Sequence, residues 1–188
     1  VLDEPTSFLD IRHKLELLSI LREMAKEKDI TVIMSLHEID LAQKVSDKVM
    51  CVNGEVIEHF GTPDEIFKDD IIKNLYGIEN GVYNISFGSV ELPRPQGEPK
   101  VFVISSCGRG IDIYRQFQKD GIPFYAGILY SNDVDCVVAR SLAAEVFEEK
   151  PFMPVSDAVY ERAEKTLRKC EKVIDAGTDI GVSNRRVE

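Results

Sequence analysis

Two adjacent carboxylates, Asp3 and Glu4, follow the apolar pair Val1-Leu2 at the start of the chain. Paired carboxylates at a strand end suit phosphoryl transfer, because one can hold the waters of a Mg²⁺ ion while its neighbour orients the attacking water. A histidine, His37, stands at the end of a second apolar run. These residue types point to phosphoryl transfer assisted by Mg²⁺.

Apolar spacing and turn residues predict the elements around these side chains. They alternate helices and strands: helix 12–28, strand 30–36, helix 38–45, strands 48–52 and 55–59, and helix 63–75. The continuous apolar run over 30–36 predicts a buried parallel strand. Asp10 and Thr62 are placed to cap the first and last helices. Asn53-Gly54 indicates a type I′ hairpin turn.

Three segments in this order resemble an ABC transporter ATP-binding subunit of the iron-complex and cobalamin uptake type. Val1 to Asp10, VLDEPTSFLD, is similar to the Walker B motif and D-loop. Ser35 to Ala42, SLHEIDLA, resembles the switch-histidine loop, and residues 53–65 resemble the end of the same nucleotide-binding domain. The chain is thus similar to the C-terminal part of such a subunit.

The resemblance implies a role for each matching residue. Asp3 supports Mg²⁺, Glu4 acts as general base, and His37 contacts the γ-phosphate and the attacking water. Ser7 and Asp10 communicate across an ATPase dimer. In the full-length parent the resemblance implies Mg²⁺ and ATP, transmembrane permease subunits, a second ATPase subunit, and a cytoplasmic position peripheral to the inner membrane.

Two observations limit what this segment is expected to do by itself. The sequence contains no Gly-x-x-x-x-Gly-Lys-Ser/Thr loop to hold phosphates and no Leu-Ser-Gly-Gly-Gln-like signature. We therefore expect the chain to be inactive as an ATPase and to hold no cofactor. Taken alone, His37 is also explained as a surface histidine and Asp10 as a helix cap.

Composition excludes several classes of partner. The formal net charge of −10 argues against binding to nucleic acid or to an anionic lipid surface. The four cysteines are far apart and predict buried free thiols in a reducing, cytoplasmic compartment. The apolar runs are far shorter than the roughly 20 residues that span a bilayer.

The pattern of expected helices and strands changes after residue 80. We expect the ATPase-like part to cover residues 1–80 and a strand and linker region to cover 81–99, in which Val82, Ile85, Phe87 and Val90 suggest one or two short strands. Residues 100–188 then alternate strands and helices: strands 101–105, 123–129, 145–147 and 172–176, and helices 111–119, 134–142 and 156–170. This α/β alternation predicts a small Rossmann-like parallel sheet covered on both faces.

A loop of small residues follows the first strand of this second part. It contains Ser105, Ser106, Gly108, Arg109 and Gly110, and it enters a helix. Such a loop can hold a small anionic or polar ligand, facing Thr178 after the last strand, or can be a tight turn without a ligand. The third glycine of a dinucleotide fingerprint is replaced by Ile113, which disfavours NAD or FAD.

The expected position of the ligand predicts the effect of one substitution. The helix that starts at Gly110 points its positive end toward the predicted crevice. We expect a bulky β-branched residue at Gly110 to block an anion while leaving the fold intact. Residues 100–188 are also similar, more loosely, to the C-terminal extension of some prokaryotic ABC ATPases.

Three functions remain compatible with the sequence. The first is part of an ABC ATP-binding protein that couples ATP hydrolysis to import and carries a regulatory or ligand-sensing accessory domain. The second is a non-catalytic small-ligand-binding or dimerisation module centred on residues 100–188. The third is a small-molecule enzyme that uses Cys107, although no base is spaced to activate its thiol. In the first two cases apolar surface on residues 1–76 predicts a homo-oligomer.

Overall fold

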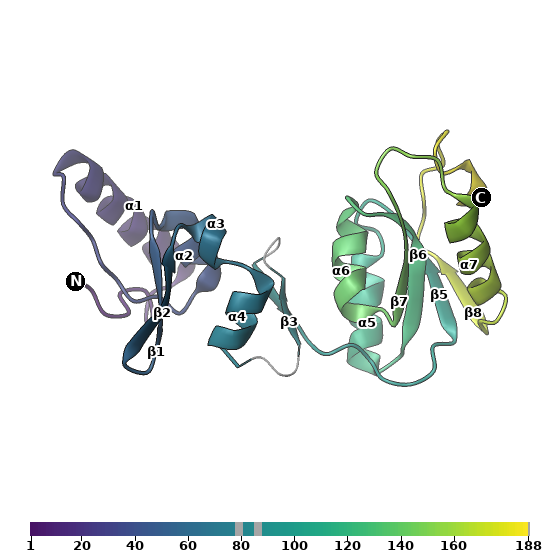
Figure 1. The fold of residues 1–188 in the computed structure, drawn as a ribbon, viewed down its shortest axis with the longest axis horizontal. Helices are drawn as coiled ribbons and strands as arrows, with labels where there is room; N and C mark the ends of the chain where they lie inside the picture. Colours follow the sequence, from purple (N-terminus) through teal and green to yellow (C-terminus); the bar gives the residue numbers. More distant parts are fainter. Residues whose placement is uncertain (78–80, 85–87, 188) are drawn as a thin grey trace. The chain divides into compact units, whose positions relative to one another are not determined.

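The structure is a computed structural model that describes residues 1–77, 81–84 and 88–187. The chain divides into two compact units, which Figure 1 draws as a ribbon. The N-terminal unit comprises residues 1–79 and 83–90, and the C-terminal unit comprises residues 80–82 and 91–188. Each unit is described by itself below.

The N-terminal unit consists of short helices and one hairpin that follow the predicted order. Its elements are α1 (Ile11–Glu27), α2 (Ile39–Val45), β1 (Val49–Asn53), β2 (Val56–Gly61), α3 (Pro63–Ile66) and α4 (Asp69–Leu75). The helices predicted over 12–28 and 38–45 and the two hairpin strands are confirmed. Phe67, Ile72 and Tyr83 form a small buried cluster behind the hairpin.

The prediction of a buried strand over 30–36 is wrong. Within the described part of the chain this segment makes one isolated parallel bridge, between Leu2 and Met34. Ile30 and Ile33 keep 42% and 44% of their surface exposed. A continuous apolar run is buried only where other elements cover both faces, and here Leu2 pairs with it at a single position.

Two further predictions, one of a helix and one of a turn, also need correction. The helix predicted over 63–75 is broken into α3 and α4, because Phe67 turns out of helical conformation (φ −79°, ψ 74°) and Lys68 is extended (φ −119°, ψ 149°). Burial of Phe67 in the cluster accompanies this break.

In the hairpin, Asn53 pairs with Val56, so the turn residues are Gly54 and Glu55. Of these two only Gly54 has a positive φ, which excludes a type I′ turn.

The C-terminal unit is an α/β layer structure. It contains β5 (Val101–Ile104), α5 (Ile111–Asp120), β6 (Phe124–Tyr130), α6 (Val134–Leu142), β7 (Glu145–Glu149), α7 (Asp157–Leu167), β8 (Lys172–Asp175) and the short 3₁₀ helix η1 (Arg185–Val187). Its four strands are parallel in the order β7-β6-β5-β8. The predicted alternation and parallel sheet are confirmed.

Helices cover both faces of this sheet, as the sequence predicts. Val103 and Phe124 pack with Tyr114 of α5 and Ala139 of α6 on one face. On the other face the rings of Phe102 and Phe147 stack and meet α7. Figure 1 shows α5 and α6 on one side of the strands and α7 on the other.

The chain passes between the units through a short sheet and an extended segment. β3 (Val82–Asn84) and β4 (Ser89–Glu91) pair with each other. Val82 and Val90 therefore lie in strands, whereas Ile85 and Phe87 lie outside the described residues. Residues 92–99 have no regular secondary structure.

Candidate functional site

The backbone bridge between Leu2 and Met34 brings the two sequence motifs together. The N–H of Leu2 donates to the carbonyl of Ile33 at 2.8 Å, and the N–H of Ser35 donates to the carbonyl of Leu2 at 3.1 Å. The two segments run parallel at this bridge. The residues after Leu2 and after Met34 consequently leave the bridge in the same direction.

Glu4 and His37 are in direct contact. Glu4 Oε1 lies 2.6 Å from His37 Nε2, and the Ser7 hydroxyl donates to Glu4 Oε2 at 3.0 Å. Glu4 has φ +43°, in the left-handed region that is costly for a residue with a Cβ. The strained backbone is therefore part of the arrangement that points its carboxylate at His37.

The Glu4–His37 contact changes the protonation of both groups. The hydrogen bond to His37, followed by that to Ser7, lowers the pKa of the Glu4 carboxyl. The Glu4 carboxylate raises the pKa of His37 by hydrogen bonding and by charge attraction. His37 is 70% exposed, so solvent screens this attraction and leaves the pair open to incoming groups.

Asp3 is held by a residue that the sequence analysis did not single out. The hydroxyl of Ser35 donates to Asp3 Oδ1 at 2.7 Å and accepts the N–H of Glu4 at 2.7 Å. A polar residue two positions before His37, in a segment parallel to residues 1–4, is the signal that could have found it.

A second set of polar contacts, a hydrogen bond and an ion pair at Glu38, joins the same two loops. Thr6 is buried, and its hydroxyl donates to Glu38 Oε2 at 2.9 Å. Lys14, on α1, forms an ion pair with Glu38. Lys14 and Thr6 together lower the pKa of the Glu38 carboxyl. The turn after Glu4, the loop after His37 and helix α1 are thereby tied to one another.

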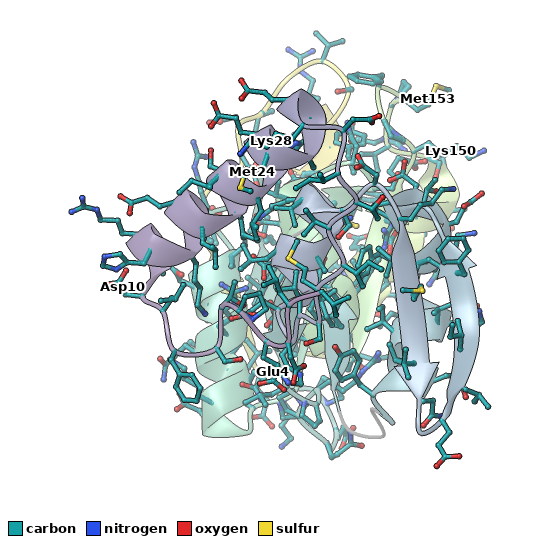
Figure 2. All side chains as sticks on the ribbon, turned by 90° about the vertical axis from the view of Figure 1, so that its left-hand side faces the viewer. Glu4, Asp10, Met24, Lys28, Lys150 and Met153 are labelled. Carbon is teal, nitrogen blue, oxygen red and sulfur yellow. The ribbon has the colours of Figure 1, made fainter. Side chains whose placement is uncertain are left out.

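Asp10 lies apart from this cluster, at the start of α1. Its side chain accepts the N–H of His13 at 3.0 Å, so the predicted helix cap is confirmed. Figure 2 labels Asp10 where α1 begins, Met24 and Lys28 at the far end of that helix, and Glu4 on the preceding loop. Of the predicted catalytic and D-loop residues, Glu4, Ser7 and His37 meet, with Asp3 alongside through Ser35, while Asp10 does not.

The donor set around Asp3 fits part of a Mg²⁺ site. Mg²⁺ in nucleotide sites is usually held by one or two carboxylates together with waters and substrate phosphates. Asp3 supplies one carboxylate, and no cluster of three or more metal-binding side chains exists among the described residues. The chain can thus contribute a carboxylate to a shared metal, but its described side chains do not enclose one.

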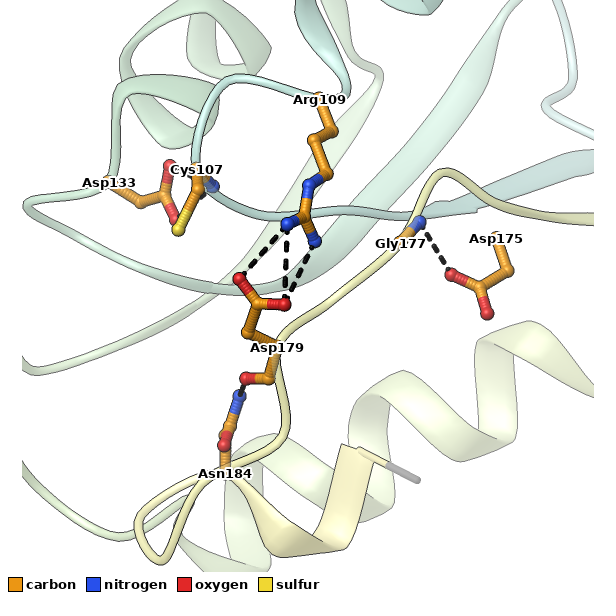
Figure 3. Close-up of polar contacts among 7 residues, drawn as sticks. All are labelled: Cys107, Arg109, Asp133, Asp175, Gly177, Asp179 and Asn184. Carbon is orange, nitrogen blue, oxygen red and sulfur yellow. Dashed lines mark hydrogen bonds and ion pairs between the residues drawn. The ribbon is translucent and has the colours of Figure 1, made fainter.

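The second candidate site lies at the edge where β5 and β8 end side by side. Arg109, after β5, forms an ion pair with Asp179, after β8, with a shortest N–O distance of 3.1 Å (Figure 3). The loops after the first and last strands therefore face each other, as expected. The hydroxyl oxygens of Ser106 and Thr178 are buried there without a hydrogen-bond partner among the described residues.

The amides predicted to receive an anion are occupied by the chain's own carboxylates. Asp133 accepts the N–H of Cys107 at 3.0 Å, and Asp135, which is fully buried, accepts the N–H of Gly110 at 3.1 Å. Burial raises the pKa of Asp135. An anion at this helix start would have to replace Asp135, and the surrounding carboxylates would repel it.

Gly110 is required by packing. A Cβ at this position would lie 2.5 Å from Ser105 Oγ and 2.6 Å from the Tyr114 ring. The hydroxyl oxygens of Ser105 and Tyr114 are 2.5 Å apart. A β-branched residue at Gly110 would therefore force Ser105 or Tyr114 to move, so the expected substitution should cost stability. Gly108 has φ +85°, which explains its glycine.

The cysteines are free thiols, but not all of them are buried as predicted. Cys51 and Cys136 are buried, Cys170 is half-buried, and Cys107 is exposed beside Arg109. Burial raises the pKa of Cys136 to about 12, which keeps that thiol protonated and inert.

Comparison with known proteins finds a matching family model and several similar proteins. A family model described as the MJ0874 family matches residues 124–187, from β6 to η1. The uncharacterized ABC transporter ATP-binding protein MJ0873 of Methanocaldococcus jannaschii is 36% identical over 130 residues, which is 69% of this chain and 45% of the relative.

Two import proteins are also similar. The petrobactin import ATP-binding protein FpuC of Bacillus anthracis is 34% identical over 83 residues, 44% of this chain and 30% of the relative. The cobalamin import ATP-binding protein BtuD of Halobacterium salinarum is 24% identical over 164 residues, 84% of this chain and 41% of the relative. The chain spans less than half the length of each relative. Its homologues are therefore ABC transporter ATP-binding subunits that share part of its length.

Proposed function

We propose that this chain supplies the hydrolytic side of an ABC importer's ATP site. The observation that supports the proposal is the Glu4–His37 contact of 2.6 Å, with Asp3 beside it. Two carboxylates and a histidine lie together on two adjoining loops, which supports the roles of general base, metal-binding carboxylate and phosphate-contacting histidine. The relatives named as import ATP-binding proteins support the same activity.

Each side chain has a distinct task in this proposal. Glu4, kept ionised by its hydrogen bonds, accepts a proton from the attacking water. His37, whose pKa the Glu4 carboxylate raises, donates a hydrogen bond toward the terminal phosphate. Asp3 would help to hold Mg²⁺, an ion that would neutralise charge on the phosphates. Ser7 orients Glu4 and leads into the turn toward a second subunit.

Partners and location follow from the same proposal. An import subunit acts with transmembrane permease subunits and a second ATP-binding subunit, so the protein would lie at the cytoplasmic face of the inner membrane. Among the described residues no helix is long and apolar enough to cross a membrane. ATP and Mg²⁺ are the proposed cofactors of the full-length protein.

The test is hydrolysis by a chimera. The part of the M. jannaschii relative that precedes the segment matching this chain is joined to Val1, and phosphate release from MgATP is measured. Glu4→Gln should lower kcat by about 100-fold or more, as loss of a general base does. Glu16→Gln, a change of an exposed carboxylate on α1, should leave it unchanged. An active chimera that is insensitive to Glu4→Gln contradicts the proposal.

The C-terminal unit is proposed to be an accessory regulatory or ligand-sensing domain. The unpaired hydroxyls of Ser106 and Thr178 beside the Arg109–Asp179 pair support a small polar ligand there. The same feature supports the second candidate, a non-catalytic binding module. Because the carboxylates of Asp133 and Asp135 would repel an anion, the probe is glycerol, a neutral polar molecule. Protection of residues 105–110 from hydrogen exchange in its presence supports a polar-ligand site, and unchanged exchange contradicts one.

A further inference from the structure

Ser35 bridges the two carboxylate residues of the candidate hydrolytic site. Its hydroxyl donates to Asp3 Oδ1 and accepts the N–H of Glu4, both at 2.7 Å. A hydroxyl has one proton and two lone pairs, so it can make both hydrogen bonds at once. Among the hydrogen bonds of the described residues, only the Ser35 hydroxyl joins the Asp3 side chain to the Glu4 N–H.

We infer that Ser35 is a positioning residue for Asp3 and Glu4. The backbone bridge at Leu2 ends immediately before Asp3, and Glu4 adopts a costly positive φ of 43°. A hydrogen bond to the Glu4 N–H compensates part of that strain by fixing the amide direction. The bond to Asp3 leaves its other oxygen available to a metal.

The inference rests on the proposed function, because positioning matters only where the carboxylates act. Ser35 follows Met34 in the segment that ends with His37. Ser35 and His37 lie on the same segment, so the Ser35 hydroxyl fixes the position of Asp3 and Glu4 relative to His37. Hydrogen-bond partners of metal-binding carboxylates typically contribute about 10- to 100-fold in metal affinity or activity.

The first experiment uses the intact 188-residue chain without metal and measures amide hydrogen exchange by NMR. Ser35→Ala and Ser35→Val should speed exchange of the Glu4 amide. Ser35→Thr keeps the hydroxyl, and the exposed position accommodates its methyl group, so slow exchange should return. The Leu2 amide, which donates to a backbone carbonyl, should exchange equally in all variants.

The second experiment measures MgATP hydrolysis by the chimera described above. Ser35→Ala and Ser35→Val, which has the shape of the Thr variant without its hydroxyl, should lower kcat by about 10-fold or more with little change in KM for MgATP, and Ser35→Thr should restore it. An active chimera with unchanged kcat in Ser35→Val overturns the inference, as does faster exchange at Leu2 together with Glu4. A wild-type chimera without hydrolysis contradicts the proposed function, whereas the exchange experiment still decides the Ser35 contact.

Discussion

At the scale of single residues, the candidate site depends on pairs that are far apart in sequence. Glu4 meets His37, and Asp3 meets Ser35, across the bridge between Leu2 and Met34. The pairs are exposed, so their effect on stability is small and their effect on protonation is the better observable. Predictions at this scale concern one side chain at a time.

The first prediction concerns the pKa of His37. Glu4→Gln removes the carboxylate that raises it, so the pKa of His37 should fall. The ion-paired form of this contact requires an ionised Glu4 and a protonated His37, whereas a neutral imidazole keeps only the hydrogen bond. The ion pair persists above the lowered pKa of Glu4 and is lost as the pH rises through the raised pKa of His37. NMR titration of the His37 ring measures the shift, with Glu16→Gln as the unchanged control. Equal titration in Glu4→Gln and wild type would show that the contact is absent in solution.

The second prediction concerns Gly110. Gly110→Val should destabilise the C-terminal unit by about 1–3 kcal/mol, because overpacking against Tyr114 and Ser105 forces them to move. Gly181→Val is the matched control, since the nearest atom to its Cβ is 3.6 Å away, in ordinary contact. Urea denaturation measures both, and equal midpoints would contradict the packing argument.

At the scale of elements, helix ends and strand ends decide where the functional side chains lie. The capping box of Thr62 and Glu65 starts α3, and Asp10 starts α1. In the C-terminal unit the order β7-β6-β5-β8 places the ends of β5 and β8 together. That order makes the Arg109–Asp179 pair possible.

The third prediction belongs to helix α1. Asp10→Ala should fray the first turn of α1 and speed its amide exchange, because the His13 amide loses its acceptor. Asp10→Ser retains an oxygen and should recover most of the lost protection. Amide exchange across the first turn of α1 monitors the effect. Equal protection in Asp10→Ala and wild type would mean that the cap contributes nothing.

The elements of the C-terminal unit were more predictable than those of the N-terminal unit. Helix α6 begins at Val134 and ends at Leu142 as predicted, because its own apolar stripe packs on its own sheet. The run over 30–36 was not predictable in the same way, since its burial depends on covering elements rather than on its composition. Ser35 and Asp135 were missed because hydrogen-bond partners distant in sequence leave no local pattern.

At the scale of the whole molecule, the N-terminal unit exposes much apolar surface. Phe8 is fully exposed, and the hairpin leaves Phe60 64% and Ile57 60% exposed. Large exposed apolar patches usually mark contacts between proteins. A net charge of −10 keeps the chain soluble but does not prevent association through such surfaces.

The fourth prediction is therefore self-association through the N-terminal unit. Sedimentation at tens of micromolar should give a homodimer or larger species, and Phe60→Ser should weaken it because less apolar area is buried on association. Val182→Ser removes a fully exposed apolar side chain from the C-terminal unit and should have no effect. A monomer throughout this concentration range refutes the prediction.

The central claim is that this chain carries the hydrolytic residues of an ATP site but contains no phosphate-binding loop. Titration calorimetry of MgATP tests it most directly, with the 188-residue chain and the chimera measured side by side. The account predicts no micromolar binding by the chain, whose sequence has no phosphate-binding loop, and micromolar binding by the chimera. Micromolar binding by the chain itself, weakened by Asp3→Ala, would contradict it.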